Sequence, residues 1–348
     1  MNDIETRDPR RDRAGAPGAA NPVLVEATRG DMVESRHRAA FAVADPRGRV
    51  VASAGDIERP VYARSAIKAL QAIPLVESGA AEAFGLSDAE IALACASHHG
   101  EPRHVETVTA WLARIGCSLE DLECGAHPPT HAASHRALIA AGEEPGAVHN
   151  NCSGKHAGFL TLARHLNAPT EGYIRSGHTV QQRVLGLLEV MTGLDLGAAP
   201  RGIDGCGIPV IGIPLANLAF AMARLADPHD QPEARQAACA RIRGAIAAEP
   251  FMVSGTEGFA TRVMAKTRGR ALIKGGAEGF YCGALPELGL GIALKVDDGA
   301  GRAAEFVMAG LLARFGIGEA EHELRAQPLR NHAGTEVGGL RPPAERPA

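Results

Sequence analysis

The chain has 348 residues, of which 45% are hydrophobic and 22% are charged, and its formal net charge is −4. This balance excludes a fully disordered chain, and the lack of excess positive charge argues against nucleic acid as a partner. Only 4% of the residues are aromatic, so there is little surface on which single-stranded bases could stack. No apolar run reaches the length of about 18 residues that a transmembrane helix needs, so no membrane partner is expected.

The two ends of the chain differ in character from its centre. Residues 1–21 are charged and rich in Pro, Gly and Ala, without the apolar stretch of a secretion signal, and we expect a disordered leader there. Residues 343–348 are expected to form a frayed tail, which leaves a single domain over 22–342. Seven cysteines without a C-x-x-C pair predict reduced thiols rather than disulfides, as in a cytoplasmic protein.

The first part of the domain is predicted to form strands and then helices. Apolar residues alternate on both sides of the turn signal at 45–48, which predicts a hairpin over 23–54. From 63 to 84 the apolar spacing becomes helical, with a kink or restart at Pro74. A capping box at Ser87 begins a short helix that ends near residue 95. Further helices are expected at 102–115, 154–166, 178–192, 214–226 and 232–248.

The pattern changes again after Gly255. A helix at 257–266 precedes three short runs, ALIKGG, GFYCGAL and LGLGIALKV, whose Gly and Pro separators predict an antiparallel meander. An amphipathic helix at 302–316 and a strand in TEVGGL follow. Strands thus occur at both ends (about 23–54 and 270–340) around a helix-rich block (about 63–266). This order predicts an α+β fold with an antiparallel sheet built from both termini.

The first segment that could perform chemistry is the S-x-x-K tetrad of Ser65 and Lys68. Residues three apart lie on one face of a helix, so the amine could take the proton of the hydroxyl and make it a nucleophile. A lysine can do this only when it is neutral, which requires burial or a neighbouring cation. The alternative is an ordinary surface serine and lysine.

Ser97 lies in CASHHGE, where small residues run into a polar turn. It could face a cleft, and the adjacent histidines invite acid–base or metal chemistry. No H-E-x-x-H or H-x-E signature is present, so a histidine-based zinc hydrolase is poorly supported. The alternative is a helix cap or a turn hydrogen bond.

Two further segments contain cysteines. Cys152, Lys155 and His156 lie at the predicted start of a helix, where a thiol pKa is lowered and a lysine is disfavoured. Cys206 lies between glycines in a loop, two residues after Asp204. Thiolates from two loops could together hold a zinc ion, although buried cysteines without a metal are common.

Lys274 lies on a predicted strand and precedes two glycines. Glycine lets a substrate come close, and a lysine on a strand is costly unless it faces a site. The alternative is a lysine that protects an edge strand from pairing. An S-x-x-K tetrad followed by a late K-x-G is typical of serine acyl-transfer enzymes of the penicillin-recognising type.

Five segments taken together resemble one family. RSAIKALQAIP, CASHHGE, HNNCSGKHAGFL, GIDGCGIP and KGGAEG are similar, in this order, to segments of the Rhizobium etli-type L-asparaginases, the asparaginase II family. The similarity runs over about residues 22–340. It implies a fold related to serine β-lactamases and penicillin-binding proteins, hydrolysis of L-asparagine to L-aspartate and ammonia, and a homodimer.

The resemblance also implies roles for particular residues. The two Ser–Lys pairs of the family match Ser65, Lys68, Ser97 and Lys274, with Lys266 and Lys295 as other choices for the last lysine. The zinc (Zn²⁺) ligands match Cys152, Lys155 and Cys206. Residues beside the substrate match Arg64, His156 and Asp204.

We therefore expect an acyl-transfer mechanism. Ser65 would attack the side-chain amide of asparagine and Lys68 would take its proton, while Ser97 and Lys274 form a second pair; the sequence leaves open which serine is acylated. Zinc is expected to anchor the substrate. Two rivals remain at this point: a serine β-lactamase or peptidase acting on another amide, and a non-catalytic zinc-containing protein that binds an amino acid.

Overall fold

The computed structural model describes residues 20–318 and 328–344. The disorder expected for 1–19 and for 345–348 lies outside these residues. The predicted leader is one residue too long at its inner end, because Asn21 is 5% exposed and donates a hydrogen bond to Asp297 at 2.8 Å. The packed part of the chain therefore includes Asn21.

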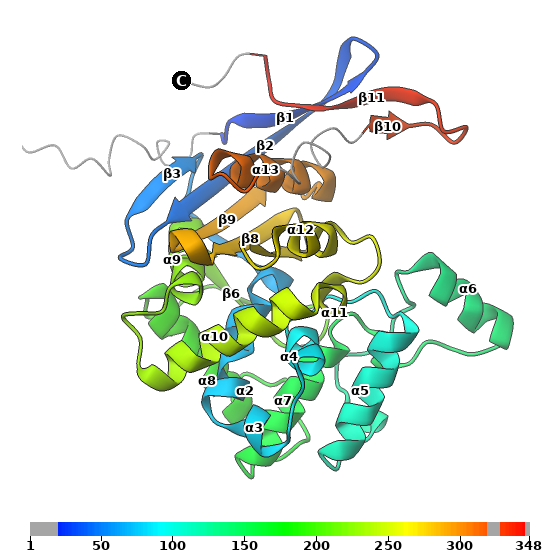
Figure 1. The fold of residues 1–348 in the computed structure, drawn as a ribbon, viewed down its shortest axis with the longest axis vertical. Coiled ribbons are helices and arrows are strands. Elements are labelled where there is room, and N and C mark those ends of the chain that lie inside the picture. Colours follow the sequence, from blue (N-terminus) through cyan, green and yellow to red (C-terminus); the bar gives the residue numbers. More distant parts are fainter. Residues whose placement is uncertain (1–19, 319–327, 345–348) are drawn as a thin grey trace, which may run out of the picture.

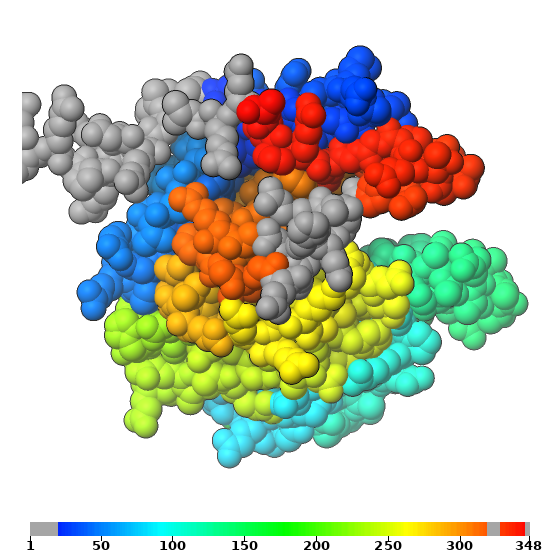
Figure 2. All heavy atoms as spheres, turned by 45° about the horizontal axis from the view of Figure 1, so that its top comes forward, coloured from blue at the N-terminus to red at the C-terminus, as the bar shows by residue number. Residues whose placement is uncertain are grey.

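The main sheet has eight strands. In chain order these are β1 (Val23–Arg29), β2 (Met32–Ala44), β3 (Val50–Ala54), β7 (Leu272–Gly276), β8 (Phe280–Leu285), β9 (Leu290–Val296), β10 (Pro328–Arg330) and β11 (Glu336–Arg341). The spatial order is β10-β11-β1-β2-β9-β8-β7, with β3 also paired to β2, and every pair is antiparallel. The sheet is thus built from both termini, as predicted (Figure 1). Figure 2 shows the blue N-terminal and red C-terminal segments side by side, where β1 pairs with β11.

The helix-rich block lies between these strands in the sequence. Its helices are α1 (Lys68–Gln71), α2 (Ile73–Glu77), α3 (Ala80–Ala83), α4 (Asp88–Ala94), α5 (Pro102–Arg114), α6 (Ala132–Ala141), α7 (Ser153–His165), α8 (Thr179–Thr192), α9 (Leu215–Ala226), α10 (Glu233–Ala248), α11 (Pro250–Ser254) and α12 (Phe259–Thr267). The last helix, α13 (Gly301–Arg314), follows the sheet meander. Short 3-10 turns lie at η1 (Arg64–Ile67), η2 (Leu119–Asp121), η3 (Ala147–His149) and η4 (Pro286–Leu288). None of the described helices is both long and apolar enough to cross a membrane.

Helix α7 forms the centre of the helical block. Every residue from Ser153 to Ala163 is buried, so this helix has no solvent face over three turns. Gly154 and Gly158 let α7 approach its neighbours closely, since a Cβ at Gly154 would collide with Leu93 of α4. The cysteine and lysine at the start of this helix are therefore held inside the molecule.

The helical restart predicted at Pro74 is confirmed, but the segment over 63–84 is divided further than predicted. The segment is divided into η1, α1, α2 and α3, with Pro74 in the first turn of α2 and Gly79 in a left-handed conformation before α3. Proline cannot donate a hydrogen bond to the preceding turn, and the left-handed residue ends the helical path. The hairpin predicted around the turn at 45–48 is confirmed as β2 and β3, and a second hairpin precedes it, because a turn at residues 30–31 separates β1 from β2.

Several elements of the structure were not predicted from the sequence. Helix α6 buries none of its residues and projects from the body (Figure 1), and α11 and β10 are short. A second sheet of three strands, β4 (Pro60–Tyr62), β5 (Arg201–Ile203) and β6 (Pro209–Pro214), has the order β4-β6-β5. It joins the segment before Ser65 to the loop that holds Asp204 and Cys206.

The contact between α9 and the main sheet depends on Gly291 of β9. A Cβ at this position would collide with the backbone of α9 at Ala219 and Ala223. Gly291→Ala is therefore expected to lower the free energy of unfolding by about 2 kcal/mol or more, measured by urea unfolding. Gly186→Ala is the control: nothing lies within 4 Å of a Cβ on this residue of α8, so alanine should raise the stability by about 0.5–1 kcal/mol. Equal stabilities for the two variants would contradict this packing.

Candidate active site

A cleft of about 680 Å³ opens where the main sheet meets the helical block. Segments far apart in the sequence line it: η1, the loop after α4, the start of α7, the loop after β5, and strand β7. Seven of the ten predicted site residues lie on its wall: Arg64, Ser65, Ser97, Cys152, Asp204, Cys206 and Lys274. The other three, Lys68, Lys155 and His156, are buried behind it.

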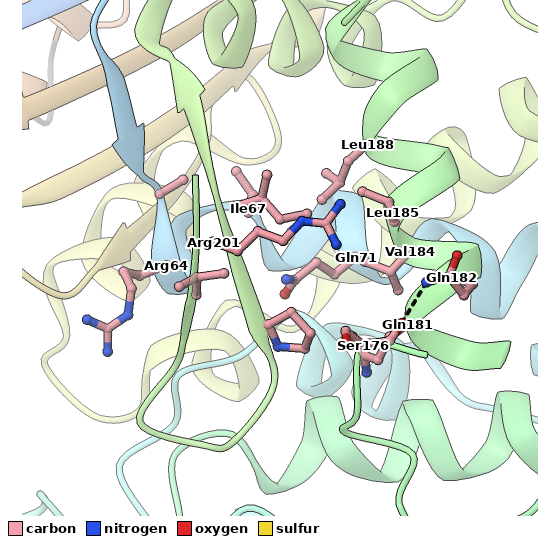
Figure 3. Close-up of a pocket in the computed structure, with 14 residues that line it drawn as sticks. Arg64, Ile67, Gln71, Ser176, Gln181, Gln182, Val184, Leu185, Leu188 and Arg201 are labelled. Carbon is pink, nitrogen blue, oxygen red and sulfur yellow. Dashed lines mark hydrogen bonds between the residues drawn. The ribbon is translucent and has the colours of Figure 1, made fainter. Parts of the chain in front are cut away.

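A much smaller cavity lies behind η1, between α8 and the three-stranded sheet (Figure 3). Its volume of about 30 Å³ suits a water molecule rather than a substrate. Gln71 and Arg201 point into it, and the guanidinium of Arg64 points away (Figure 3). The chemistry is therefore in the larger cleft.

Strand β7 and η1 pack closely together and place Ser65 and Lys274 on the wall of the same cleft. A Cβ on Gly276 would lie 2.6 Å from the Ala63 carbonyl oxygen, so only glycine allows this approach. Arg64 has a φ of 50°, a left-handed conformation that is strained for a residue with a side chain. Its side chain forms an ion pair with Asp204 across the cleft. The strained turn thus holds Arg64 on the loop of the second cysteine and leaves Ser65 facing the cleft.

The hydroxyl of Ser97 lies between two lysine amines. Its Oγ is 3.1 Å from Lys68 Nζ and 2.8 Å from Lys274 Nζ. Lys68 also donates to the Ala96 carbonyl oxygen and contacts Cys152 Sγ at 3.1 Å, and it is fully buried. Lys274 also donates to the Gly275 carbonyl oxygen at 2.7 Å. Both predicted lysines therefore meet at one serine.

The direct Ser65–Lys68 pair expected from the tetrad is not present. An ammonium has three donors, and those of Lys68 are directed to Ala96, Ser97 and Cys152. Lys68 extends into the interior, whereas Ser65 stays on the cleft wall. The structure thus joins Lys68 to the other serine of the predicted set.

Lys274 has the electrostatic environment of a proton acceptor. Burial, and then the nearby charge of Lys68, hold the pKa of Lys274 well below its ordinary value. A neutral amine 2.8 Å from Ser97 Oγ can take the hydroxyl proton. Of the other lysines left open by the sequence, Lys295 donates to the Glu278 carbonyl oxygen at 2.8 Å and, like Lys266, is not among the described residues that line the cleft.

Lys274→Arg is expected to lower kcat/KM by about 1,000-fold, because arginine stays charged and cannot accept the proton. In the unchanged protein, kcat/KM should fall as the pH decreases through the lowered pKa of Lys274, where the amine becomes protonated. Lys295→Arg, a matched control outside the cleft, should keep nearly full activity. An active Lys274→Arg variant would remove this lysine from the role of base.

Cys152, Lys155 and Cys206 form a second cluster beside the first. Lys155 Nζ donates to Cys206 Sγ at 2.9 Å, and the Cys206 thiol contacts Asp204 Oδ2 at 3.3 Å. A hydrogen bond with Cys206, together with the charges of Lys155 and Lys68, lowers the pKa of Cys152 well below the ordinary thiol value, whereas the same bond raises the pKa of Cys206. Burial acts to lower the pKa of Lys155, but the charges of Cys152 and Cys206 raise it overall. The cluster thus favours one thiolate, on Cys152.

The donor set of this cluster suits zinc in type. Two thiols and one amine are soft or borderline ligands, and they come from α7 and from the loop after β5. No three of the described His, Cys, Asp and Glu residues are grouped as metal ligands, so the set reaches three only through Lys155. Lysine must lose its proton to bind a metal, so a metal here would compete with protons at Lys155.

His156 lies behind the cluster, not on the cleft wall. Its ring is fully buried and its Nδ1 is 2.7 Å from the Tyr173 hydroxyl. Its Nε2 is the one buried side-chain polar atom of the described residues that has no hydrogen-bond partner. This position argues against the direct contact with a substrate that the resemblance implies for His156.

Other cleft residues were not found from the sequence. Tyr281 of β8, Glu305 of α13, and Arg262 of α12 line one end of the cleft. The sequence predicts a strand or a helix at each of these positions but no role for these residues in a site. No local motif marks them, because the fold alone brings these elements together.

A model of the L-asparaginase II family matches residues 25–342. The chain belongs to the L-asparaginase II family. This match confirms the resemblance seen in the sequence and supports an amide hydrolase. No curated protein matches the chain significantly.

The chain also resembles several solved structures in fold. The crystal structure of Mglu is 16% identical to this chain with a TM-score of 0.44, and the match covers 81% of this chain and 67% of Mglu. For Mglu in its tris and glutamate form, the match covers 64% of Mglu. This chain thus spans about two thirds of the length of Mglu. A β-lactamase from Mycobacterium bovis is 16% identical with a TM-score of 0.36, and the match covers 80% of this chain and 94% of the β-lactamase. An octameric penicillin-binding protein homologue from Pyrococcus abyssi is 14% identical with a TM-score of 0.41, and the match covers 82% of this chain and 74% of that one.

Proposed function

We propose that this protein hydrolyses L-asparagine to L-aspartate and ammonia through a serine ester. The family match supports an amide hydrolase, and the observation that carries the proposal is the position of Ser97 Oγ between two lysine amines. A serine with a neutral amine at hydrogen-bond distance is the arrangement that acyl transfer needs.

The steps follow from this geometry. Lys274 accepts the proton of Ser97, whose Oγ attacks the side-chain amide carbon of asparagine. The carbon–nitrogen bond then breaks, and Lys274 returns the proton to the departing ammonia. Water hydrolyses the aspartyl ester, with Lys274 again as base, and frees the serine. Lys68 orients the Ser97 hydroxyl, and backbone N–H groups near η1 are candidates to stabilise the oxyanion.

Ser65 remains the second candidate for the acylated residue. It lines the same cleft, and η1 presents it next to the ion pair of Arg64 and Asp204. We assign it to the side of the cleft where the substrate binds, together with that ion pair. The comparison of two serine variants, given in the Discussion, separates the two candidates.

The second cluster is proposed to hold one zinc ion on Cys152, Lys155 and Cys206. A bound zinc would supply a positive charge and an open coordination position that could anchor the α-amino or carboxylate group of asparagine. The ion pair of Arg64 and Asp204 would orient the same end of the substrate. We also propose, from the resemblance alone, a homodimer in the cytoplasm; light scattering of the purified protein would measure the number of subunits.

The substrate class is tested by comparing three substrates with the purified, zinc-supplemented protein. We expect ammonia release from L-asparagine, a kcat/KM for L-glutamine at least about tenfold lower because of its extra methylene, and no hydrolysis of a chromogenic cephalosporin. Cephalosporin hydrolysis without asparagine turnover would favour the β-lactamase alternative. Binding of asparagine without turnover would favour the non-catalytic one.

A further inference from the structure

The cleft has a polar end that the proposed reaction does not use. It is formed by Tyr281, Glu305 and Arg262, and the Phe259 ring holds the Tyr281 ring edge-on, with centroids 5.6 Å apart at 88°. The cleft volume of about 680 Å³ lies in the range of pockets for drug-sized ligands. Asparagine, with fewer than a dozen non-hydrogen atoms, fills only part of it.

Tyr281 connects this end to the catalytic lysine. It pairs with Gly275 across β7 and β8, and its phenol covers that glycine: a Cβ on Gly275 would lie 2.8 Å from Tyr281 Cζ and 3.0 Å from its Oη. Gly275 adjoins Lys274 and accepts a hydrogen bond from its Nζ at 2.7 Å. A substrate that reaches Ser97 can therefore extend past Gly275 to the phenol.

Glu305 is a carboxylate with unused hydrogen-bonding capacity. Among the described residues its one hydrogen-bond partner is the Tyr281 hydroxyl, at the long distance of 3.4 Å, although a carboxylate can accept about four bonds. Burial raises the pKa of Glu305, and the charge of Arg262 and the hydrogen bond with Tyr281 offset this only in part. Arg262 donates instead to the Glu257 carbonyl oxygen, and within the described chain it forms no ion pair with Glu305. An incoming cation would supply the missing compensation.

Asp204, a second carboxylate on the cleft wall, has a different electrostatic environment from Glu305. Asp204 is already neutralised by Arg64 and contacted by the Cys206 thiol at 3.3 Å. Of these two cleft carboxylates, Glu305 thus has the greater capacity to receive a positively charged group. A ligand with a cationic tail would place the tail at Glu305 and its amide at Ser97.

We propose that the end of the cleft formed by Tyr281 and Glu305 is a leaving-group subsite for β-aspartyl amides whose amine part has a second, positively charged ammonium. This inference rests on the proposed function and extends it to longer substrates. In the reaction, the bond from Ser97 Oγ to the amide carbon forms and the carbon–nitrogen bond breaks. The diamine leaves with the proton from Lys274, and water converts the ester to L-aspartate.

The test compares N4-(4-aminobutyl)-L-asparagine with N4-pentyl-L-asparagine, which is uncharged at the end of its tail but similar in shape. We expect the unchanged protein to prefer the charged amide by about tenfold or more in kcat/KM, as a hydrogen bond to a charged group predicts. Glu305→Gln should bring this ratio close to one while asparagine turnover stays within about twofold. Glu257→Gln, which removes another cleft carboxylate, should leave the preference intact.

The proposal would be overturned by equal use of both amides by the unchanged protein, by a preference that survives Glu305→Gln, or by a preference lost in Glu257→Gln instead. Glu305→Asp is the second variant if Glu305→Gln does not fold, and it should lower the preference because the charge retreats by one methylene. Hydrolysis of asparagine without hydrolysis of either longer amide would refute the subsite alone. Failure to hydrolyse asparagine, with the charged amide still cleaved, would refute the proposed substrate and keep the subsite.

Discussion

Ser97→Ala is expected to lower kcat/KM for L-asparagine by about 10,000-fold or more, the scale of loss when an acylating serine is removed. The reason is geometric: the Ser97 hydroxyl lies 3.1 Å from Lys68 Nζ and 2.8 Å from Lys274 Nζ, so alanine removes the group that both amines contact. Ammonia release measures the loss. The circular dichroism spectrum of the variant should match that of the unchanged protein, since the removed hydroxyl is small.

Ser65→Ala is the matched control for this prediction. Ser65 lines the cleft, and its hydroxyl is not among the partners of Lys68 Nζ, so its loss should weaken substrate binding and raise KM more than it lowers kcat. The opposite result, with Ser65→Ala inactive and Ser97→Ala retaining more than about a tenth of the activity, would make Ser65 the acylated residue. That outcome would restore the expectation from the sequence.

The double substitution Cys152→Ala and Cys206→Ala is expected to abolish zinc binding. It removes two of the three proposed ligands, and sites of this kind bind zinc with an apparent free energy on the order of 10 kcal/mol. Metal analysis after dialysis should show about one equivalent of zinc in the unchanged protein and almost none in the variant. KM for asparagine should rise more than kcat falls, because we propose that the metal anchors the substrate.

Two other cysteines provide the control for the metal prediction. Cys239 and Cys282 are fully buried and lie outside the cluster, so Cys239→Ala with Cys282→Ala should keep the zinc. One equivalent of zinc in the Cys152 and Cys206 double variant would show that the metal is held elsewhere. The readout is the metal content itself, so it does not depend on activity.

The sequence allowed prediction of the architecture because the signals were local. Alternating apolar residues in β2 and β7–β9, and the helical spacing of α5, α7 and α13, survive in the structure. The helical segment over 63–84 restarts at Pro74 as predicted, but the additional break at Gly79 depends on a left-handed backbone conformation that apolar spacing does not reveal. Helix α6 was missed because it buries none of its residues and shows no apolar periodicity.

The sequence predicted which residues form the site but not which of their side chains contact one another. The motifs identified the two serines and the lysines, and the fold places the serines and Lys274 on the wall of one cleft and Lys68 and Lys155 behind it. The partner of Lys68 depends on the path of its side chain through the interior, which spacing along a helix cannot reveal. Tyr281 and Glu305 could not be predicted for a similar reason: they become neighbours only when α13 packs against β8 and β9.

The most direct test of the account is the release of ammonia and L-aspartate from L-asparagine, measured for the purified protein and Ser97→Ala side by side. The account predicts equal amounts of both products from the unchanged protein and almost none from the variant. If the folded, zinc-loaded protein released neither product, or if Ser97→Ala released both at the unchanged rate, the proposed Ser97–Lys274 chemistry would be contradicted.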